Sequence, residues 1–156
     1  MMLAYRLVRL IENHSDELAG SLLQRVKNSL HIVDYDRVPA EELRQRVFEI
    51  YRHLGEWLLG KSEGEIERRY IQIGARRAAQ GVPFSQIQWC ITLTKENLFE
   101  FMKQESAADR PIEIFGEFEL LQLLDQFFDN AIYYASVGYE QATESHVRRE
   151  TAAACD

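Results

Sequence analysis

The chain has 156 residues, of which 46% are hydrophobic and 28% are charged, and its formal net charge at pH 7 is -7. A chain of this length buries about 70% of its unfolded surface, so we expect one domain over residues 1–156, with a core at 16–147 and a tail at 148–156. The acidic balance argues against nucleic acid as the main partner, because phosphate binding requires a concentrated basic surface.

The sequence also points to a cytoplasmic protein. No apolar stretch reaches the roughly 20 residues that a membrane-spanning helix needs, so we expect no membrane partner. The first residues, Met1–Asn13, contain charged side chains and no small-residue cleavage site, which argues against a signal peptide. Cys90 lies in an apolar helical run and Cys155 in a small-residue tail, so a disulfide between them is not expected.

The first half of the chain has helical spacing almost throughout. An apolar stripe predicts one long helix or two consecutive ones, with Ser15 as an internal cap; its members are Leu3, Leu7, Leu10, His14, Leu18, Leu22 and Val26. The strand-like segment His31–Asp36 is expected to be a connector. A further helix is predicted from Pro39, since proline suits the first helical position, to Gly60.

The next helix has the clearest boundaries. Ser62 and Glu65 form a capping box, and Gly81 followed by Pro83 ends the helix and allows another to begin. The predicted apolar face contains Ile66, Tyr70, Ile73, Gly74 and Ala78.

Arg77 lies within that apolar arc, where a cation must reach a partner or an edge. We expect a carboxylate or helix-terminal carbonyls to hold it, and Arg77→Ala to cost on the order of 2–4 kcal/mol. The alternative is an anion or partner site. Arg76, about 100° round the helix, is expected to be exposed. The local basic cluster alternates with glutamates, which favours a solvated mixed-charge helix; its members are Arg68, Arg69, Arg76 and Arg77.

Two more helices complete the prediction. The helix from Pro83 to about Gln104 is apolar on more than one side and is expected to be central. The last, from Pro111 to about Val147, would be about 55 Å long, at 1.5 Å per residue. Together these patterns predict an all-α fold with a long C-terminal helix.

The last helix carries two apolar stripes. The first ends in small residues that permit close approach of another helix, namely Ala131, Ala135, Gly138 and Ala142. The second consists of Leu120, Phe127 and Tyr134. Two stripes suggest two partners, so we expect the small residues to form the seam of a homodimer. The alternative is one wide stripe that faces the core of the same chain.

We find no pattern that predicts a metal site, a haem site or catalysis. The histidines are scattered, with Glu49 and His53 expected to form a surface ion pair; the four are His14, His31, His53 and His146. A haem globin needs a proximal histidine, and the window Ile66–Phe84, where it should lie, has none. No nucleophile motif or phosphate loop is present, so we expect no enzyme and no cofactor.

Two strings resemble the N-terminal domain of RsbT co-antagonist proteins of the RsbRD type, which are bacterial stress-signalling proteins. The first is Ile-Gly-Ala-Arg-Arg-Ala-Ala-Gln-Gly-Val-Pro at 73–83, which includes Gly74 and Gly81. The second is Phe-Phe-Asp-Asn-Ala-Ile-Tyr-Tyr-Ala-Ser-Val-Gly-Tyr-Glu at 127–140. The resemblance implies a single globin-like domain without haem, a homodimer through terminal helices, and a sensory or scaffolding role.

Members of that family typically carry a C-terminal STAS domain, whereas this chain ends at Asp156. The resemblance therefore implies either an output in a partner, such as a STAS or kinase signalling protein, or a stand-alone or truncated input module. The expected input is a small apolar ligand in a core pocket or a partner at the arginine-rich helix. The competing interpretation is a ligand-carrying or haem-binding globin-type sensor.

Overall fold

The computed structural model describes residues 5–107 and 110–155, except for the side chain of Cys155; Leu3 lies outside this range. These residues contain helices and no strand, which confirms the predicted all-α class. The elements are α1 Tyr5–Asn13, α2 Ser15–Asn28, the 3-10 helix η2 Val33–Arg37, α3 Ala40–Arg52, the π-helix η3 Glu56–Gly60, α4 Glu63–Ala79, α5 Phe84–Glu105 and α6 Pro111–Cys155.

The first apolar stripe forms two helices, and the break between them falls at His14. The His14 backbone is not helical, with φ -107° and ψ 19°, and its ring Nδ1 lies 2.7 Å from the carbonyl oxygen of Leu10. Ser15 is the buried first residue of α2, so its predicted role as an internal cap is wrong. The segment that follows α2 is a connector, as predicted, and contains η2.

The predicted helix from Pro39 to Gly60 is interrupted. α3 ends at Arg52, and a π-helical turn, η3, follows at 56–60. In this turn the Lys61 N–H donates to the carbonyl of Glu56, five residues earlier, at 2.8 Å. Pi-helical turns are rare and occur often at functional sites. This one places Trp57 and Lys61 beside α4.

Both predicted ends of α4 are confirmed. The Ser62 hydroxyl accepts from the Glu65 N–H, and the Glu65 carboxylate accepts from the Ser62 N–H, which completes a capping box. At the other end Gly81 has φ 76°, and the N–H of Val82 donates to the carbonyl of Arg77. This is a Schellman ending, which requires the left-handed backbone that glycine adopts freely.

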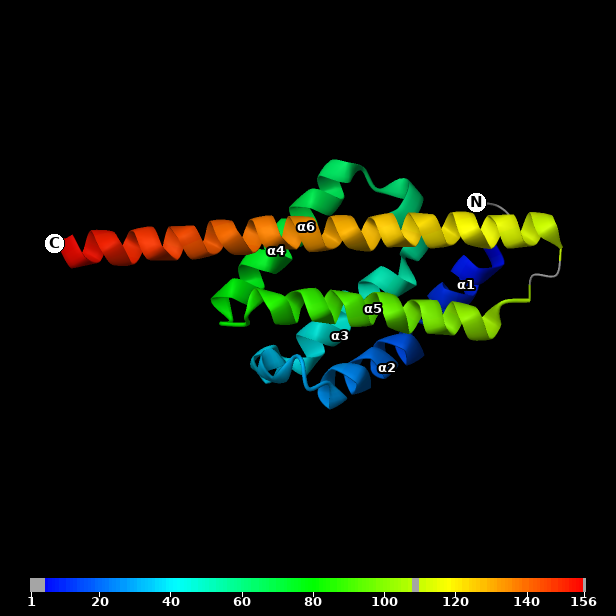
Figure 1. The fold of residues 1–156 in the computed structure, drawn as a ribbon, viewed down its shortest axis with the longest axis horizontal. Coiled ribbons are helices and arrows are strands. Elements are labelled where there is room, and N and C mark those ends of the chain that lie inside the picture. The colour runs from blue at the N-terminus through cyan, green and yellow to red at the C-terminus, as the bar shows by residue number, and fades with distance from the viewer. Residues whose placement is uncertain (1–4, 108–109, 156) are drawn as a thin grey trace.

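α6 runs along the whole body and continues past it (Figure 1). α5 lies beside it and also contacts α1, α2 and α4, which agrees with the predicted central position. The side chains of residues 143–154 in α6 are exposed, so this end of the helix projects from the body and does not contribute to the hydrophobic core. The helix extends to Cys155, beyond the predicted end near Val147. Within the described ranges, no helix is both long and apolar enough to cross a bilayer.

Candidate functional site

Arg77 is the buried cation that the sequence singles out, and a carboxylate holds it. Only 3% of Arg77 is exposed. Its Nη1 donates to the Glu42 carboxylate of α3 at 2.8 Å and to the Gln80 side-chain oxygen at 2.9 Å. The predicted geometry, a core-facing arginine with a charged partner, is confirmed. The contact joins α4 to α3.

Glu42 collects further donors from the end of α4. Arg76 and the Gln80 amide also donate to its two oxygens, at 3.2–3.4 Å. These bonds, from Arg76 first and then from Arg77, lower the pKa of the Glu42 carboxyl to about 2. Arg76 is exposed, as predicted, but it is paired. The basic cluster is therefore partly a structural clamp rather than wholly a solvated surface.

Beneath this clamp lie two buried protic side chains, Tyr35 and Cys90. Burial raises the pKa of the Cys90 thiol to about 11 and raises the pKa of Tyr35 well above its ordinary value. Both groups are therefore neutral at pH 7. A neutral, buried thiol packs as a small hydrophobe, which is the role predicted for Cys90.

The small residues of α6 pack against α4 of the same chain. A Cβ built on Gly74 would lie 2.0 Å from the carbonyl oxygen of Ala135, and one on Gly138 would lie 2.0 Å from that of Ile71. Ala131 and Ala135 are fully buried. The two helices meet backbone to backbone, which only small residues allow.

This packing corrects the predicted dimer seam. The stripe assigned to a second chain is occupied from within at Ala131, Ala135 and Gly138, and Ala142 lies half-buried beyond that contact, so a partner would need another face. Leu120 and Phe127 of the second stripe are buried as well. The alternative left open by the sequence, one wide stripe facing the chain's own core, is the arrangement observed over this part of α6. Helical periodicity identifies which faces of a helix are apolar, but it does not say which other helix packs against them.

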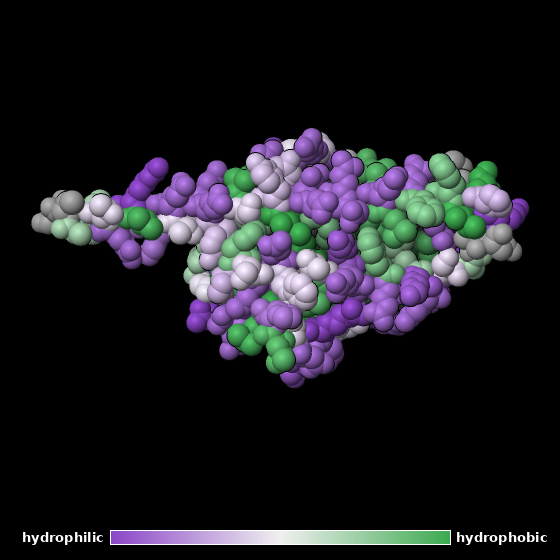
Figure 2. All heavy atoms as spheres, in the orientation of Figure 1, coloured by the Kyte–Doolittle hydropathy of each residue, from purple (hydrophilic) through white to green (hydrophobic). Residues whose placement is uncertain are grey.

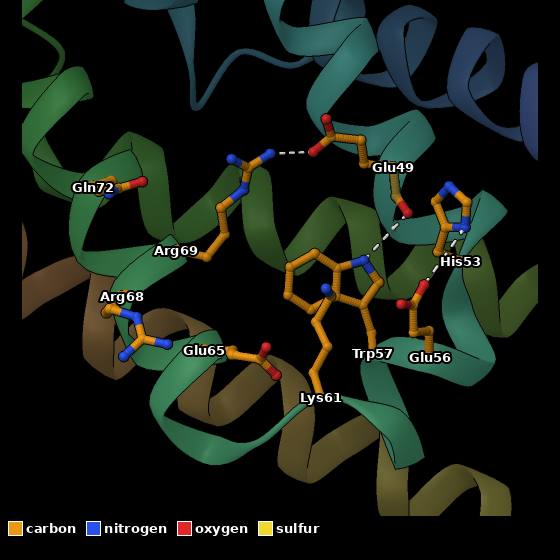
Figure 3. Close-up of a pocket in the computed structure, with 9 residues that line it drawn as sticks. All are labelled: Glu49, His53, Glu56, Trp57, Lys61, Glu65, Arg68, Arg69 and Gln72. Carbon is orange, nitrogen blue, oxygen red and sulfur yellow. Dashed lines mark hydrogen bonds and ion pairs between the residues drawn. The ribbon is translucent and has the colours of Figure 1, made fainter.

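A cleft of about 550 Å³ opens where the end of α3, the turn η3 and the first half of α4 meet (Figure 3). It is lined by charged and polar side chains around one indole, namely Glu49, His53, Glu56, Trp57, Lys61, Glu65, Arg68, Arg69 and Gln72. The volume lies in the range of small-molecule sites.

Each carboxylate of the cleft already has a partner in the chain. Glu49 accepts from Arg69, and Glu56 lies 3.8 Å from His53 Nδ1. The Glu65 carboxylate belongs to the capping box, and the backbone bond from Ser62 lowers its pKa. The predicted Glu49–His53 pair is not formed: Glu49 pairs with Arg69 of α4 instead, and His53 lies near Glu56.

Trp57 separates the cleft from the core. Its indole N–H donates to the carbonyl of Glu49 at 3.2 Å. Its ring centroid lies 6.4 Å from that of Tyr70 and 6.0 Å from that of Phe127 on α6, and these two rings lie 5.9 Å apart. On the cleft side the Lys61 ammonium lies 4.8 Å from the indole centroid.

No pattern in the sequence predicted this cleft or a place for Trp57 at its edge. A signal was present in the two glycines, Gly55 and Gly60, that flank Trp57 and weaken a continuous helix there. The position of the π-turn itself depends on tertiary packing.

The histidines occupy separate places. His31 stacks edge-on against Trp89, His53 lies in the cleft, and His146 pairs with Glu150 on the projecting end of α6. Across residues 5–107 and 110–154, no three His, Cys, Asp or Glu side chains gather in a way that would hold a metal ion.

Residues 16–154 match the family described as the RsbT co-antagonist protein rsbRD N-terminal domain. No curated protein and no solved structure matches the chain.

Proposed function

The chain belongs to the RsbT co-antagonist protein rsbRD N-terminal domain family, and on this premise we propose that it is a non-catalytic input domain of bacterial stress signalling. In this proposal the domain is a globin-like body that works in the cytoplasm without haem. It receives a signal in its body and passes it, through α6, to a STAS or kinase partner.

The aromatic trio supports this proposal most directly. Trp57 lines the cleft on one side and contacts Phe127 of α6 on the other, with Tyr70 of α4 touching both rings. Aromatic pairs at these distances contribute about 0.5–1.5 kcal/mol beyond the area they bury. An event that moves Trp57 therefore changes the packing of α6 directly.

The α4–α6 contact supports the second half of the path. Because no space remains between the two backbones at Gly74 and Gly138, these helices must move together or separate. The rigid α6 then carries a displacement to its exposed end at 143–154.

In cells, the proposal is tested with a transcriptional reporter of the stress response in the source bacterium. We expect deletion of the gene and the variant Trp57→Leu both to change reporter output after stress, with the variant protein present at normal level. Trp89→Leu, which removes the other indole, should respond as wild type does. A deletion strain whose stress response is unaltered would contradict the proposal.

We further propose that a homodimer forms through the terminal helices, but by the start of α6 rather than by its small residues. Hydrophobic surface gathers at the end of the molecule where α6 begins (Figure 2). Phe115 is 73% exposed, and Ile112 and Phe118 are exposed beside it. Apolar side chains grouped in this way are typical of an interface.

Sedimentation tests the dimer. Phe115→Ser and Phe118→Ser should weaken self-association at least tenfold and leave the melting temperature unchanged, because these side chains are exposed in the single chain. Tyr133→Ser, at another exposed aromatic position on α6, is the matched control. If the wild-type protein sediments as a monomer at a protein concentration of roughly tens of micromolar, the proposed dimer interface is rejected.

Absorbance tests the haem-free part of the proposal against a haem-binding globin-type sensor. We expect purified protein to show no Soret band, including after incubation with haemin. A stoichiometric band that disappears when one of the four histidines is replaced would instead support the haem alternative.

A further inference from the structure

In the cleft of Figure 3, the acidic side chains have closer partners within the chain than two of the basic side chains do. Glu49 accepts from Arg69, the Glu65 carboxylate accepts from the Ser62 N–H, and Glu56 lies 3.8 Å from the imidazole of His53. Arg68 makes no ion pair with any residue that the structure describes, and Lys61 lies over the indole; the charges of both act on the Glu65 carboxylate from a distance and help to lower its pKa. The side chains of Lys61 and Arg68 therefore remain available to an anionic ligand.

The hold on Lys61 is weak enough to be exchanged. A lysine over an indole at the protein surface is held weakly, and an ammonium–carboxylate bond is stronger once it is partly desolvated. When Lys61 turns towards an anion, the cleft-side face of Trp57 is uncovered. A flat ring is the group that best covers an indole face.

The indole itself is held in place from behind. Its N–H is bonded to the Glu49 carbonyl, and Tyr70 and Phe127 pack on its core side. Because the aromatic floor is already in position, binding of a ligand requires only that the Lys61 side chain turn aside.

We propose that this cleft binds a small organic carboxylate with a flat ring, which lies on Trp57 in place of the Lys61 ammonium while Lys61 and Arg68 hold the carboxylate. The role of this ligand as the input rests on the proposed signalling function. Binding itself does not depend on that function, so the two can fail separately.

Tryptophan fluorescence tests the proposal on the purified chain. The sequence has two tryptophans, so the variant Trp89→Phe leaves Trp57 as the reporter. We expect sodium benzoate to change its emission in a saturable manner, with a Kd on the order of 1 mM for so small a ligand. Benzamide lacks the charge and cyclohexanecarboxylate lacks the flat ring, so each should bind at least fivefold more weakly.

Variants locate the site. In the Trp89→Phe background, Lys61→Gln and Arg68→Gln should each raise the benzoate Kd about fivefold to tenfold. Arg52→Gln, at an exposed arginine outside the cleft, should not change it. A linear, unsaturated response to benzoate would overturn the proposal. The proposal would also be overturned if the Lys61, Arg68 and Arg52 variants bound benzoate with equal affinity. Equal affinity of the protein for inorganic phosphate and for benzoate would overturn it as well.

Discussion

The two halves of α4 each carry an adjacent pair of arginines, Arg68 and Arg69 in the first and Arg76 and Arg77 in the second, but have opposite roles. The second half, from Gly74 to Gly81, is fixed: Gly74 meets the α6 backbone, Arg77 is buried on Glu42, and Gly81 ends the helix in a left-handed turn. The first half, from Glu63 to Gln72, lines an open cleft with side chains that are largely exposed.

The difference shows what decides the role of a charge on a helix. Arg77 and Arg68 are both arginines of α4, yet Arg77 is itself buried and bonded to the Glu42 carboxylate, whereas Arg68 is exposed at the cleft. A buried pair is costly to break, whereas an exposed charge contributes little to stability. The fixed half therefore positions α6, and the open half remains free to meet a ligand.

The largest effect is expected where the fixed half touches α6. Gly74→Ala and Gly138→Ala each place a Cβ 2.0 Å from a backbone oxygen, so the helices must separate. We expect each to lower the free energy of unfolding by about 3 kcal/mol, at the upper end of overpacking costs, as measured by urea denaturation.

Gly20→Ala is the matched control, since nothing lies within 4 Å of a Cβ at that helical position. It should be neutral or stabilise the protein by about 0.5–1 kcal/mol. If all three variants unfolded alike, the close α4–α6 contact would be refuted.

Next in size is the loss of the buried arginine. Arg77→Ala should cost about 2 kcal/mol, the lower end of the range predicted from the sequence, because Glu42 keeps Arg76 and is itself partly exposed. Arg76→Ala should cost no more than about 0.5 kcal/mol, since Arg76 is largely exposed. If both variants melted at the same temperature as wild type, Arg77 would not contribute to the stability of the fixed half of α4.

Acid provides a third test of the same clamp. The pKa of Glu42 is about 2 in the folded chain, below its ordinary value of 4.5. The unfolded chain therefore binds more protons in this range, and the contribution of Glu42 to stability is full above pH 4.5 and is lost as the pH falls towards 2. Unfolding measured across this range should show a flatter decline for Glu42→Gln than for wild type. Parallel curves would contradict the assignment.

The smallest effect is expected in the open half. Arg68→Ala should change the free energy of unfolding by less than about 0.5 kcal/mol, because its side chain makes no ion pair with a described residue. A loss as large as that of Arg77→Ala would mean that the two halves of α4 do not differ as described.

Local chemistry explains which features the sequence predicted. The capping box at Ser62, the glycine ending at Gly81 and the buried cation at Arg77 all follow from rules that act within a few residues. The break after Arg52 and the π-turn at 56–60 do not, because they depend on how Trp57 packs against other helices. Small residues on α6 predicted a close neighbour correctly, but periodicity could not say that the neighbour was α4.

The central claim is that the cleft is coupled to α6 through Trp57, and amide hydrogen exchange along α6 tests it most directly. In Trp57→Leu, amides of residues 120–135 should exchange about tenfold faster than in wild type, which corresponds to about 1.4 kcal/mol, within the contribution of an aromatic pair. Trp89→Leu, which removes an indole stacked on His31, should leave these amides unchanged. Equal exchange along α6 in wild type and Trp57→Leu would contradict the coupling.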